Sequence, residues 1–354
     1  MSRIKSLLFL LVLAAQVPLA SATVTYAVGS CKPSLHSFTT IMDALAATPS
    51  PNVVEICAGA YPEQVVVTFP VTLEGISAGD SAGVYIVPPS AGLVPNASDE
   101  FGDSLAVQLL VENAGDEVNL TNLDLSAGAQ QTGSSYIVGV FYHNSSGTMN
   151  HIETENQSGN GLGVGVWVDG GSNTPTVTVE NSDLQRFDYA GVVVKSYNPA
   201  LTVNIKGNDV TGNFPNADGI YLAHGATTSV SDNLIASMAE GILIDGGKAT
   251  ISKNKVVATG VGIDIETDGV SATSNTISDG VGFGIGILAN SAVAPVTDNT
   301  IAQSNYAIIF NCIAGGNVHS NTILDAAIGL YSVPTGTVSA NTYYNVGTNG
   351  TGGC

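Results

Sequence analysis

Aromatic and charged side chains recur at regular spacing between residues 139 and 266, in a combination that suits a carbohydrate ligand. Phe141, Trp167 and Tyr221 each lie two residues after a glycine. The residues four places after such a glycine include His143, Asp169, Lys195, Asp245 and Glu266. Flat rings stack on pyranose faces, and polar or charged groups bond sugar hydroxyls. The sequence therefore favours a saccharide-binding face on which Phe141, His143, Trp167 and Tyr221 contact the ligand.

A repeat positions these side chains. Gly-apolar-x-apolar segments begin at Gly219, Gly241, Gly262 and Gly284, and each is followed by an Asn-x-apolar segment. The asparagines of these and the next coils are spaced by 21, 21, 24, 22 and 20 residues, at Asn233, Asn254, Asn275, Asn299, Asn321 and Asn341. Helical repeats need about 33 residues or more, whereas short alternating apolar segments with Gly and Asn at the corners predict strands.

Each coil of such a repeat places its strands about 4.8 Å from those of the previous coil, in parallel sheets around an apolar interior. Side chains alternate along a strand, so we expect the residues two and four after each glycine to point outward. We expect each asparagine to occupy a left-handed corner and to bond its amide to the next asparagine in the stack.

At these residues the chain resembles the right-handed parallel β-helix (pectin-lyase-like) family, which includes pectate lyases and many secreted bacterial proteins. The resemblance implies an all-β fold, and the period predicts roughly twelve coils in a single domain. The segment around Gly59, Glu63 and Gly75 is also similar to the first coils of pectin methylesterases. Glu63 is interpreted as structural, because that segment recurs in non-catalytic positions. A shared fold does not specify a function.

The chain divides into four expected segments. Arg3 and Lys5 precede the apolar run 7–15 and the small residues 20–22, so 1–22 is interpreted as a signal peptide. An N-terminal cap at 23–60 is expected to hold a helix over 37–48, with Ser37 as N-cap, covering the first coil. The β-helix follows at 61–345 and a C-terminal tail at 346–354. No other segment is long and apolar enough to span a membrane, so the expected location is extracellular or periplasmic.

The four cysteines favour disulfides in an exported protein. We expect Cys31 to pair with Cys57 and Cys312 with Cys354, one bridge near each end of the solenoid. A metal site is the alternative.

Charge excludes one class of partner. The formal net charge is −20, and residues 1–22 hold two of the nine basic residues and no acidic one, which gives −22 for the rest. So acidic a chain is not expected to bind nucleic acid. It is also not expected to attract uronate polymers unless Ca²⁺ offsets the repulsion.

The motifs of several related enzymes are absent, including those of pectin methylesterases, polygalacturonases and alginate epimerases. The resemblance to pectate lyases implies a Ca²⁺-assisted elimination with a basic residue as proton acceptor. On that interpretation Lys195 is the base, with Arg186 as the alternative. The Ca²⁺ ligands would come from Asp169, Asp218, Asp245 and Glu266.

Two functions of different classes therefore remain. The leading hypothesis is an exported protein that binds or processes extracellular polysaccharide along the face from Phe141 to Glu266. The alternative is a non-enzymatic solenoid that acts as a structural or adhesive element at a cell surface or in a matrix. The oligomeric state is left open.

Overall fold

The structure is a computed structural model of the chain. It describes residues 23–77, 83–128, 130, 132–212, 216–280, 284–290, 295–311, 317–333 and 338–351. The expected signal peptide and the expected Cys312–Cys354 bridge lie outside these residues.

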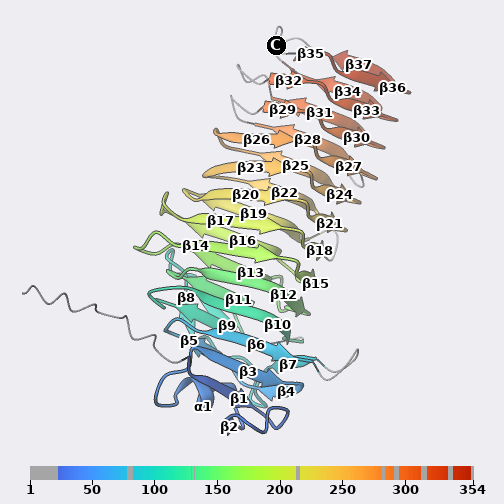
Figure 1. The fold of residues 1–354 in the computed structure, drawn as a ribbon. Coiled ribbons are helices and arrows are strands. Elements are labelled where there is room, and N and C mark those ends of the chain that lie inside the picture. Colours follow the sequence, from blue (N-terminus) through green and yellow to red (C-terminus); the bar gives the residue numbers. More distant parts are fainter. Residues whose placement is uncertain are drawn as a thin grey trace, which may run out of the picture.

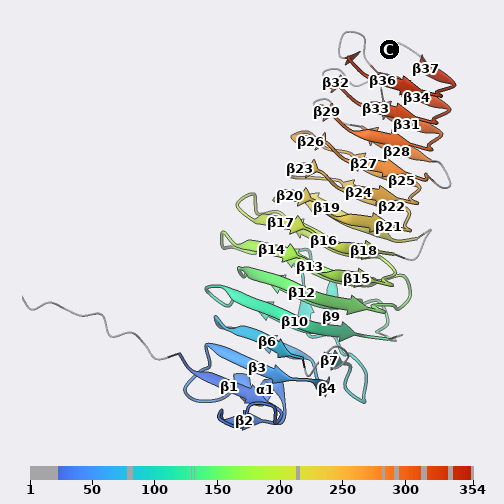
Figure 2. The same cartoon turned by 45° about the vertical axis from the view of Figure 1, so that its right-hand side comes forward.

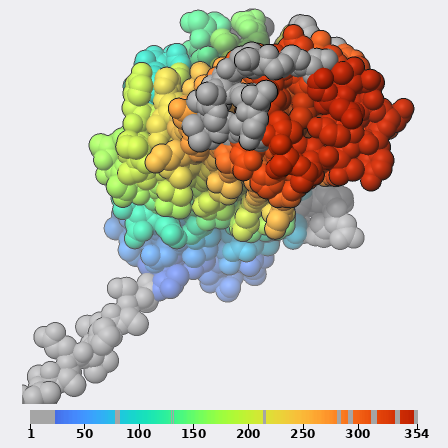
Figure 3. Space-filling model, turned by 90° about the horizontal axis from the view of Figure 1, so that it is seen from above, coloured from blue at the N-terminus to red at the C-terminus, as the bar shows by residue number. Residues whose placement is uncertain are grey.

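The chain forms a parallel β-solenoid of about 11 turns, in agreement with the expected all-β fold. Figures 1 and 2 show the coils stacked along one axis, from the N-terminal coils in blue to the C-terminal coils in red. Figure 3 looks along the stack onto the C-terminal coils. Within the described residues the strands form two sheets, of 24 and 13 strands.

The smaller sheet, called sheet B, contains one parallel strand from each coil and the additional short strand β8. Its members are β5 (Val65–Val67), β8 (Ala97–Ser98), β9 (Ser104–Glu112), β11 (Tyr136–His143), β13 (Gly163–Asp169), β16 (Ala190–Ser196), β19 (Asp218–His224), β22 (Glu240–Ile244), β25 (Val261–Ile265), β28 (Ile285–Ala289), β31 (Tyr306–Phe310), β34 (Ile328–Tyr331) and β37 (Thr348–Thr351). All pair in parallel with the next coil except β8, which pairs antiparallel with β9.

The larger sheet, called sheet A, begins at the N-terminal end of the stack. Its first strands are β1 (Thr25–Val28), β2 (Ser37–Phe38), β3 (Val53–Cys57), β4 (Gly59–Pro62), β6 (Thr72–Ile76), β7 (Val84–Val87), β10 (Val118–Ser126) and β12 (Gly147–Glu155). From β14 onward each coil gives sheet A two short strands separated by a corner.

These later strand pairs repeat the same plan. They are β14 (Thr176–Glu180) with β15 (Asp183–Gln185), β17 (Thr202–Lys206) with β18 (Asp209–Thr211), β20 (Thr227–Ser231) with β21 (Leu234–Ala236), β23 (Lys248–Ser252) with β24 (Lys255–Val257), β26 (Val270–Thr273) with β27 (Thr276–Ser278), β29 (Pro295–Thr297) with β30 (Thr300–Ala302), β32 (Asn317–His319) with β33 (Thr322–Leu324), and β35 (Val338–Ser339) with β36 (Thr342–Tyr344).

The asparagine ladder lies at the corner between the two strands of each pair, and its hydrogen bonds confirm the expected stacking. Asn254 Nδ2 donates to Asn275 Oδ1 at 3.0 Å and to the Val230 carbonyl at 3.0 Å. Its Oδ1 accepts from Asn233 Nδ2 at 2.9 Å and from the Asn233 backbone N–H at 3.1 Å. The same pattern continues from Asn208 to Asn341.

The left-handed residue at this corner is not the asparagine, contrary to expectation. Positive φ occurs at the residue before it, for example at Asp232 (58°), Lys253 (59°) and Ser274 (58°). The asparagine itself turns its amide into the stack, where it is nearly fully buried. The corner therefore needs a left-handed residue followed by an amide.

The glycine column lies where a carbonyl oxygen of the next coil leaves no room for a side chain on sheet B. A Cβ on Gly241 would lie 2.5 Å from the Gly262 carbonyl oxygen, and one on Gly262 would lie 2.4 Å from that of Gly286. No side chain fits at these approaches. In the next coil the column contains Gly286, because Gly286 lies opposite Gly262 in the pairing of β25 with β28. The expectation that this segment begins at Gly284 is therefore wrong by two residues.

Apolar side chains from both sheets fill the interior. Val166 and Val168 of β13, for instance, share one buried cluster with Val177 and Val179 of β14. Each coil buries this cluster only against its neighbours, so the stack is one continuous core.

The N-terminal end is closed by a short helix and a disulfide. The helix α1 (Ile41–Leu45) is capped by Thr40 and is shorter than the expected 37–48, because Ser37 and Phe38 form β2. The Glu63 carboxylate accepts from the N–H groups of Ile41 (2.9 Å) and Met42 (3.0 Å). Glu63 thus supports the helix N-terminus, which agrees with its structural interpretation.

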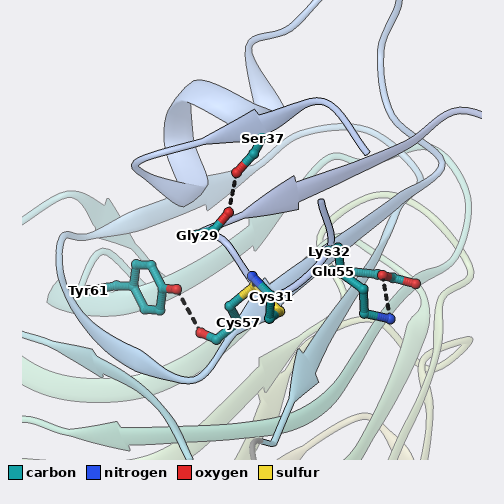
Figure 4. Close-up of a disulfide and its surroundings, with 7 residues drawn as sticks. All are labelled: Gly29, Cys31, Lys32, Ser37, Glu55, Cys57 and Tyr61. Carbon is teal, nitrogen blue, oxygen red and sulfur yellow. Dashed lines mark hydrogen bonds and ion pairs between the residues drawn. A yellow bond between two sulfur atoms is a disulfide. The ribbon is translucent and has the colours of Figure 1, made fainter. Parts of the chain in front are cut away.

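Cys31 and Cys57 form the expected disulfide, which ties the loop after β1 to the end of β3 (Figure 4). The Tyr61 hydroxyl donates to the Cys57 carbonyl at 2.6 Å beside it. At the other end, part of the expected C-terminal tail forms β37, which pairs with β34. Among the described helices there is none with the length and apolar character that a membrane span requires.

Candidate functional site

The outer face of sheet B carries the predicted site residues in columns, as the alternation requires. The first residue after each glycine, such as Val166, belongs to the interior cluster, whereas the second, such as Trp167, packs on the opposite side of the sheet. His143, Asp169 and Lys195 occupy the next outward column on β11, β13 and β16.

A loop covers the N-terminal part of this face. Residues 88–103, here called the strap, run across β9 to β16 and include β8 (Figure 1). Phe141 is 0% and Trp167 1% exposed, and they form an apolar cluster with Leu105 and Val138. The expectation that these two rings lie open to a sugar is therefore wrong. Ala97 of the strap, together with Tyr136 and Tyr189, packs against this cluster and removes the two rings from solvent.

Charged and aromatic contacts hold the strap in place. Lys195 Nζ lies 2.5 Å from Asp103 Oδ2 and 3.1 Å from Asp99 Oδ2, and 4.4 Å from the centre of the Phe101 ring. The Glu100 backbone N–H donates to Asp169 Oδ2 at 3.1 Å. The sequence could not show these contacts, because Asp103 and Lys195 are 92 residues apart.

The environment of Lys195 makes it a poor proton acceptor. Burial lowers the pKa of its ammonium, but the hydrogen bonds and charges of Asp103 and Asp99 outweigh that effect and raise the pKa above its usual value. A general base needs its pKa near the working pH. Arg186 lies outside this face, at the end of β15 in sheet A, where its Nη2 is 2.8 Å from Glu155 Oε1.

His143 and Asp169 form a close pair at the edge of the strap. His143 Nδ1 lies 2.6 Å from Asp169 Oδ1, and Asp169 is 0% exposed. The hydrogen bond to Asp169 raises the pKa of His143, and burial opposes it only in part. This pair joins β11 to β13. The structure therefore gives Asp169 a histidine as its partner.

Beyond the strap, three neighbouring strands bring acidic residues together on the same face. This carboxyl cluster consists of Asp218, Glu240, Asp245, Asp264 and Glu266. Asp218 and Glu240 are register partners at the start of β19 and β22, and Asp264 on β25 lies beside Leu243. Tyr221, the third predicted aromatic residue, is only half-buried, and its hydroxyl lies 3.4 Å from Asp245 Oδ2.

Two members of the cluster hold a proton at neutral pH or close to it. Burial, and then the charges of Glu266 and Glu240, raise the pKa of Asp264 to about 8. Burial and the charge of Glu240 raise the pKa of Asp218 to about 7. Burial and the charge of Glu266 also raise the pKa of Glu240. Crowded carboxyl groups behave in this way because each disfavours the charged form of the next.

Unpartnered oxygen atoms point to the same place. Asp264 is 6% exposed, and its Oδ1 atom is buried with no hydrogen-bond partner in the described part of the chain. The same holds for Glu240 Oε2. Buried acceptors without donors are uncommon, so they mark a position where a proton or a ligand completes the arrangement.

Sequence reasoning selected Asp218, Asp245 and Glu266 as site residues but not Glu240. Asp264 alternates with Glu266 and Asp268, which suits either Ca²⁺ coordination or a solvated acidic edge, and the sequence does not decide between them. A signal for Glu240 was present, because it precedes Gly241 as Asp218 precedes Gly219. Asp264 lies two residues after Gly262, in the outward column, and the sequence alone does not show that it is buried. In the next coil the corrected column places Asn290 beside Glu266, with Nδ2 2.5 Å from Oε1.

The expected Ca²⁺ ligands lie in different columns of the outer face. Asp169 is engaged with His143, whereas Asp218 lies in a different column from Asp245 and Glu266. Within the described residues no group of three or more His, Cys, Asp or Glu side chains is arranged to hold a metal. Ca²⁺ binding stays a prediction from the sequence.

The raised pKa of Asp264 predicts a pH-dependent stability. An unfolded Asp releases its proton near pH 3.9, whereas folded Asp264 keeps its proton to about pH 8, so the folded state binds more protons between these values. The free energy of unfolding of the protein should therefore fall as pH rises from about 4 to about 8. Asp264→Asn should remove that loss and stabilise the protein at pH 9 relative to wild type, by on the order of a few kcal/mol. Urea unfolding at pH 5 and pH 9 measures it, and parallel pH curves for the two proteins would contradict it.

The repeat region that contains this site matches a known family of repeats. Residues 138–301 match the family described as the right handed beta helix region. The chain is a right-handed parallel β-helix protein. The β-helix resemblance drawn from the glycine and asparagine columns is thereby confirmed.

Solved structures of similar shape include three that cover most of this β-helix. The mannuronan C-5 epimerase A-module of Azotobacter vinelandii has a TM-score of 0.52 and 15% identity, over 87% of this chain and 93% of that one. A lacto-N-biosidase of family GH136 from Eubacterium ramulus has a TM-score of 0.59 and 11% identity, over 90% of this chain and 67% of that one. A tailspike protein of E. coli bacteriophage HK620, in complex with a pentasaccharide, has a TM-score of 0.57 and 13% identity, over 91% of this chain and 65% of that one. At these identities the likeness shows the fold alone.

Curated relatives match only a short segment of this β-helix protein. Over 67 residues, which are 19% of this chain, it is 33% identical to large ribosomal subunit protein uL6 of Listeria welshimeri. The matched part is 38% of the length of that protein. So short a match shows neither family nor function.

Proposed function

We propose that this β-helix protein binds a polysaccharide across the uncovered part of the outer face of sheet B and hydrolyses its glycosidic bonds at the carboxyl cluster. One observation carries the proposal. Asp264 is a buried carboxylic acid that keeps its proton to about pH 8, and exposed carboxyl groups lie beside it. Glycoside hydrolysis needs such a pair, an acid of raised pKa and a carboxylate in the same site.

Each group then has a step to perform. Asp264 donates its proton to the glycosidic oxygen while the bond between that oxygen and the anomeric carbon breaks. Asp245, an exposed carboxyl group on the neighbouring coil of the same face, accepts the proton of the attacking water, whose oxygen bonds to the anomeric carbon. Tyr221 offers a partly exposed ring beside Asp245 on which a pyranose can stack.

Two further findings support a carbohydrate outside the cell as the substrate. Solved structures of this fold include an epimerase of mannuronan, a biosidase and a tailspike with a bound pentasaccharide. The Cys31–Cys57 disulfide suits an oxidising compartment. Elimination with Lys195 as base fits less well than hydrolysis, because Lys195 is held between Asp99 and Asp103.

The test is a cleavage assay on neutral, amino and uronic oligosaccharides, in which new reducing ends are measured. We expect wild type to cleave at least one of them and Asp264→Asn to cleave it at least about 100-fold more slowly, as for loss of a general acid. Asp232→Asn is the matched control, because Asp232 is an exposed sheet A corner where Asn suits the positive φ. Absence of both binding and cleavage across the panel would reject the proposal.

A further inference from the structure

We infer that the saccharide taken by the carboxyl cluster carries positive charge, as a free amino sugar does, and is not a uronate. The inference rests on the proposed function and names its substrate class. It follows from where the basic residues of the chain lie and from which acidic oxygens lack a donor.

Basic residues are nearly absent from sheet B. The chain has nine Lys and Arg residues, two of which are Arg3 and Lys5. Of the others only Lys195 lies on sheet B, and it is enclosed by Asp99 and Asp103 of the strap. The remaining six lie near the N-terminal cap or on sheet A, at Lys32, Arg186, Lys206, Lys248, Lys253 and Lys255. Within the described residues no lysine or arginine other than Lys195 lies on the sheet that carries the cluster.

Two buried oxygen atoms of the cluster also lack a hydrogen-bond donor. Asp264 Oδ1 and Glu240 Oε2 are buried without a partner in the described part of the chain. Asp264 is more than nine-tenths buried and lies on the outward side of the sheet, between Leu243 and Leu288 of the adjacent strands. The charges of Glu266 and Glu240 act on it. A ligand that completes this site must bring N–H or O–H groups to these oxygens.

An ammonium group meets both needs. It has three N–H donors, and its charge offsets the repulsion that raises the pKa values of Asp264 and Asp218. Sugar hydroxyls supply donors but no charge, and uronate carboxylates add to the repulsion. Burial is the largest cause of the raised pKa of Asp264 and persists when an ammonium binds, so Asp264 keeps the proton that hydrolysis requires.

The experiment compares hexamers of one backbone. Titration calorimetry at pH 6 and 0.15 M salt would use β-1,4-glucosamine hexamer, its N-acetylated counterpart and galacturonic acid hexamer, because amines are charged at that pH. We expect the glucosamine hexamer to bind at least 10-fold more tightly than the N-acetylated one, and the galacturonate not to bind. Glu240→Gln and Glu266→Gln should each reduce the preference for the amine, because each removes a negative charge beside Asp264. Asp264→Asn, which replaces a group that is protonated at pH 6, and the sheet A control Asp232→Asn should keep the preference.

The outcomes separate the two claims. Equal binding of the amine and N-acetylated hexamers, weakened in Asp264→Asn, would overturn the charge inference and leave the saccharide site in place. A preference for the amine that is unchanged in Glu240→Gln and in Glu266→Gln would also overturn it, because it would show adsorption to an acidic protein in general. No binding of any hexamer, together with no cleavage of any oligosaccharide, would overturn the proposed function itself.

Discussion

Replacing Asn254 with alanine is expected to lower the free energy of unfolding by about 3–5 kcal/mol. The side chain is 1% exposed and makes four hydrogen bonds to the coils on either side. Its removal leaves the Asn233 backbone N–H, one Asn233 amide hydrogen and the Val230 carbonyl without partners. Each buried group left unpaired costs about 1–3 kcal/mol.

Chemical denaturation of the full chain measures this effect. Asn341→Ala is the matched control, because it removes the same side chain from the last coil of the ladder, where the hydrogen bonds are only partly buried. Water can replace those bonds, so we expect a loss of about 1 kcal/mol there. An Asn254→Ala variant within 1 kcal/mol of wild type would show that the ladder does not hold the coils together.

Replacing Lys195 with methionine is expected to release the strap from sheet B. Asp99 is 5% exposed and would lose the cationic partner that the structure gives it, and an uncompensated buried charge costs about 3–5 kcal/mol. Methionine keeps most of the length of the lysine side chain and removes its charge. The strap is the cover over Trp167, so that ring should become accessible to water.

Tryptophan fluorescence reports this directly, because Trp167 is the single tryptophan of the chain. In the variant we expect a red-shifted emission and stronger quenching by acrylamide. Lys206→Met is the control, since Lys206 forms an exposed pair with Glu180 on sheet A and should leave Trp167 buried. Emission and quenching unchanged in Lys195→Met would contradict the role given to Lys195.

The fold was predictable because each coil repeats the same local chemistry. The glycine column marks close approaches between coils and the asparagine column marks corners, so both are visible as sequence periods. The errors were local. Gly284 and Gly286 both fit the glycine pattern, and only the pairing of β25 with β28 decides between them.

The site was predictable only in part, because two of its determinants are not periodic. The strap joins Asp103 to a lysine 92 residues away, and it converts the expected open rings of Phe141 and Trp167 into buried ones. The protonation of Asp264 depends on burial together with Glu266 and Glu240, which lie on two different strands. Alternation showed which side chains point outward but not which of them are covered.

The pH dependence of hydrolysis tests the central claim most directly. If protonated Asp264 is the general acid, kcat/KM should fall tenfold per pH unit above about pH 8, where this group loses its proton. Glu240→Gln removes a neighbouring negative charge that raises the pKa of Asp264, so the fall should then begin at lower pH. A kcat/KM that stays constant from pH 6 to pH 10, or that falls at the same pH in Glu240→Gln, would contradict the assignment of Asp264 as the acid.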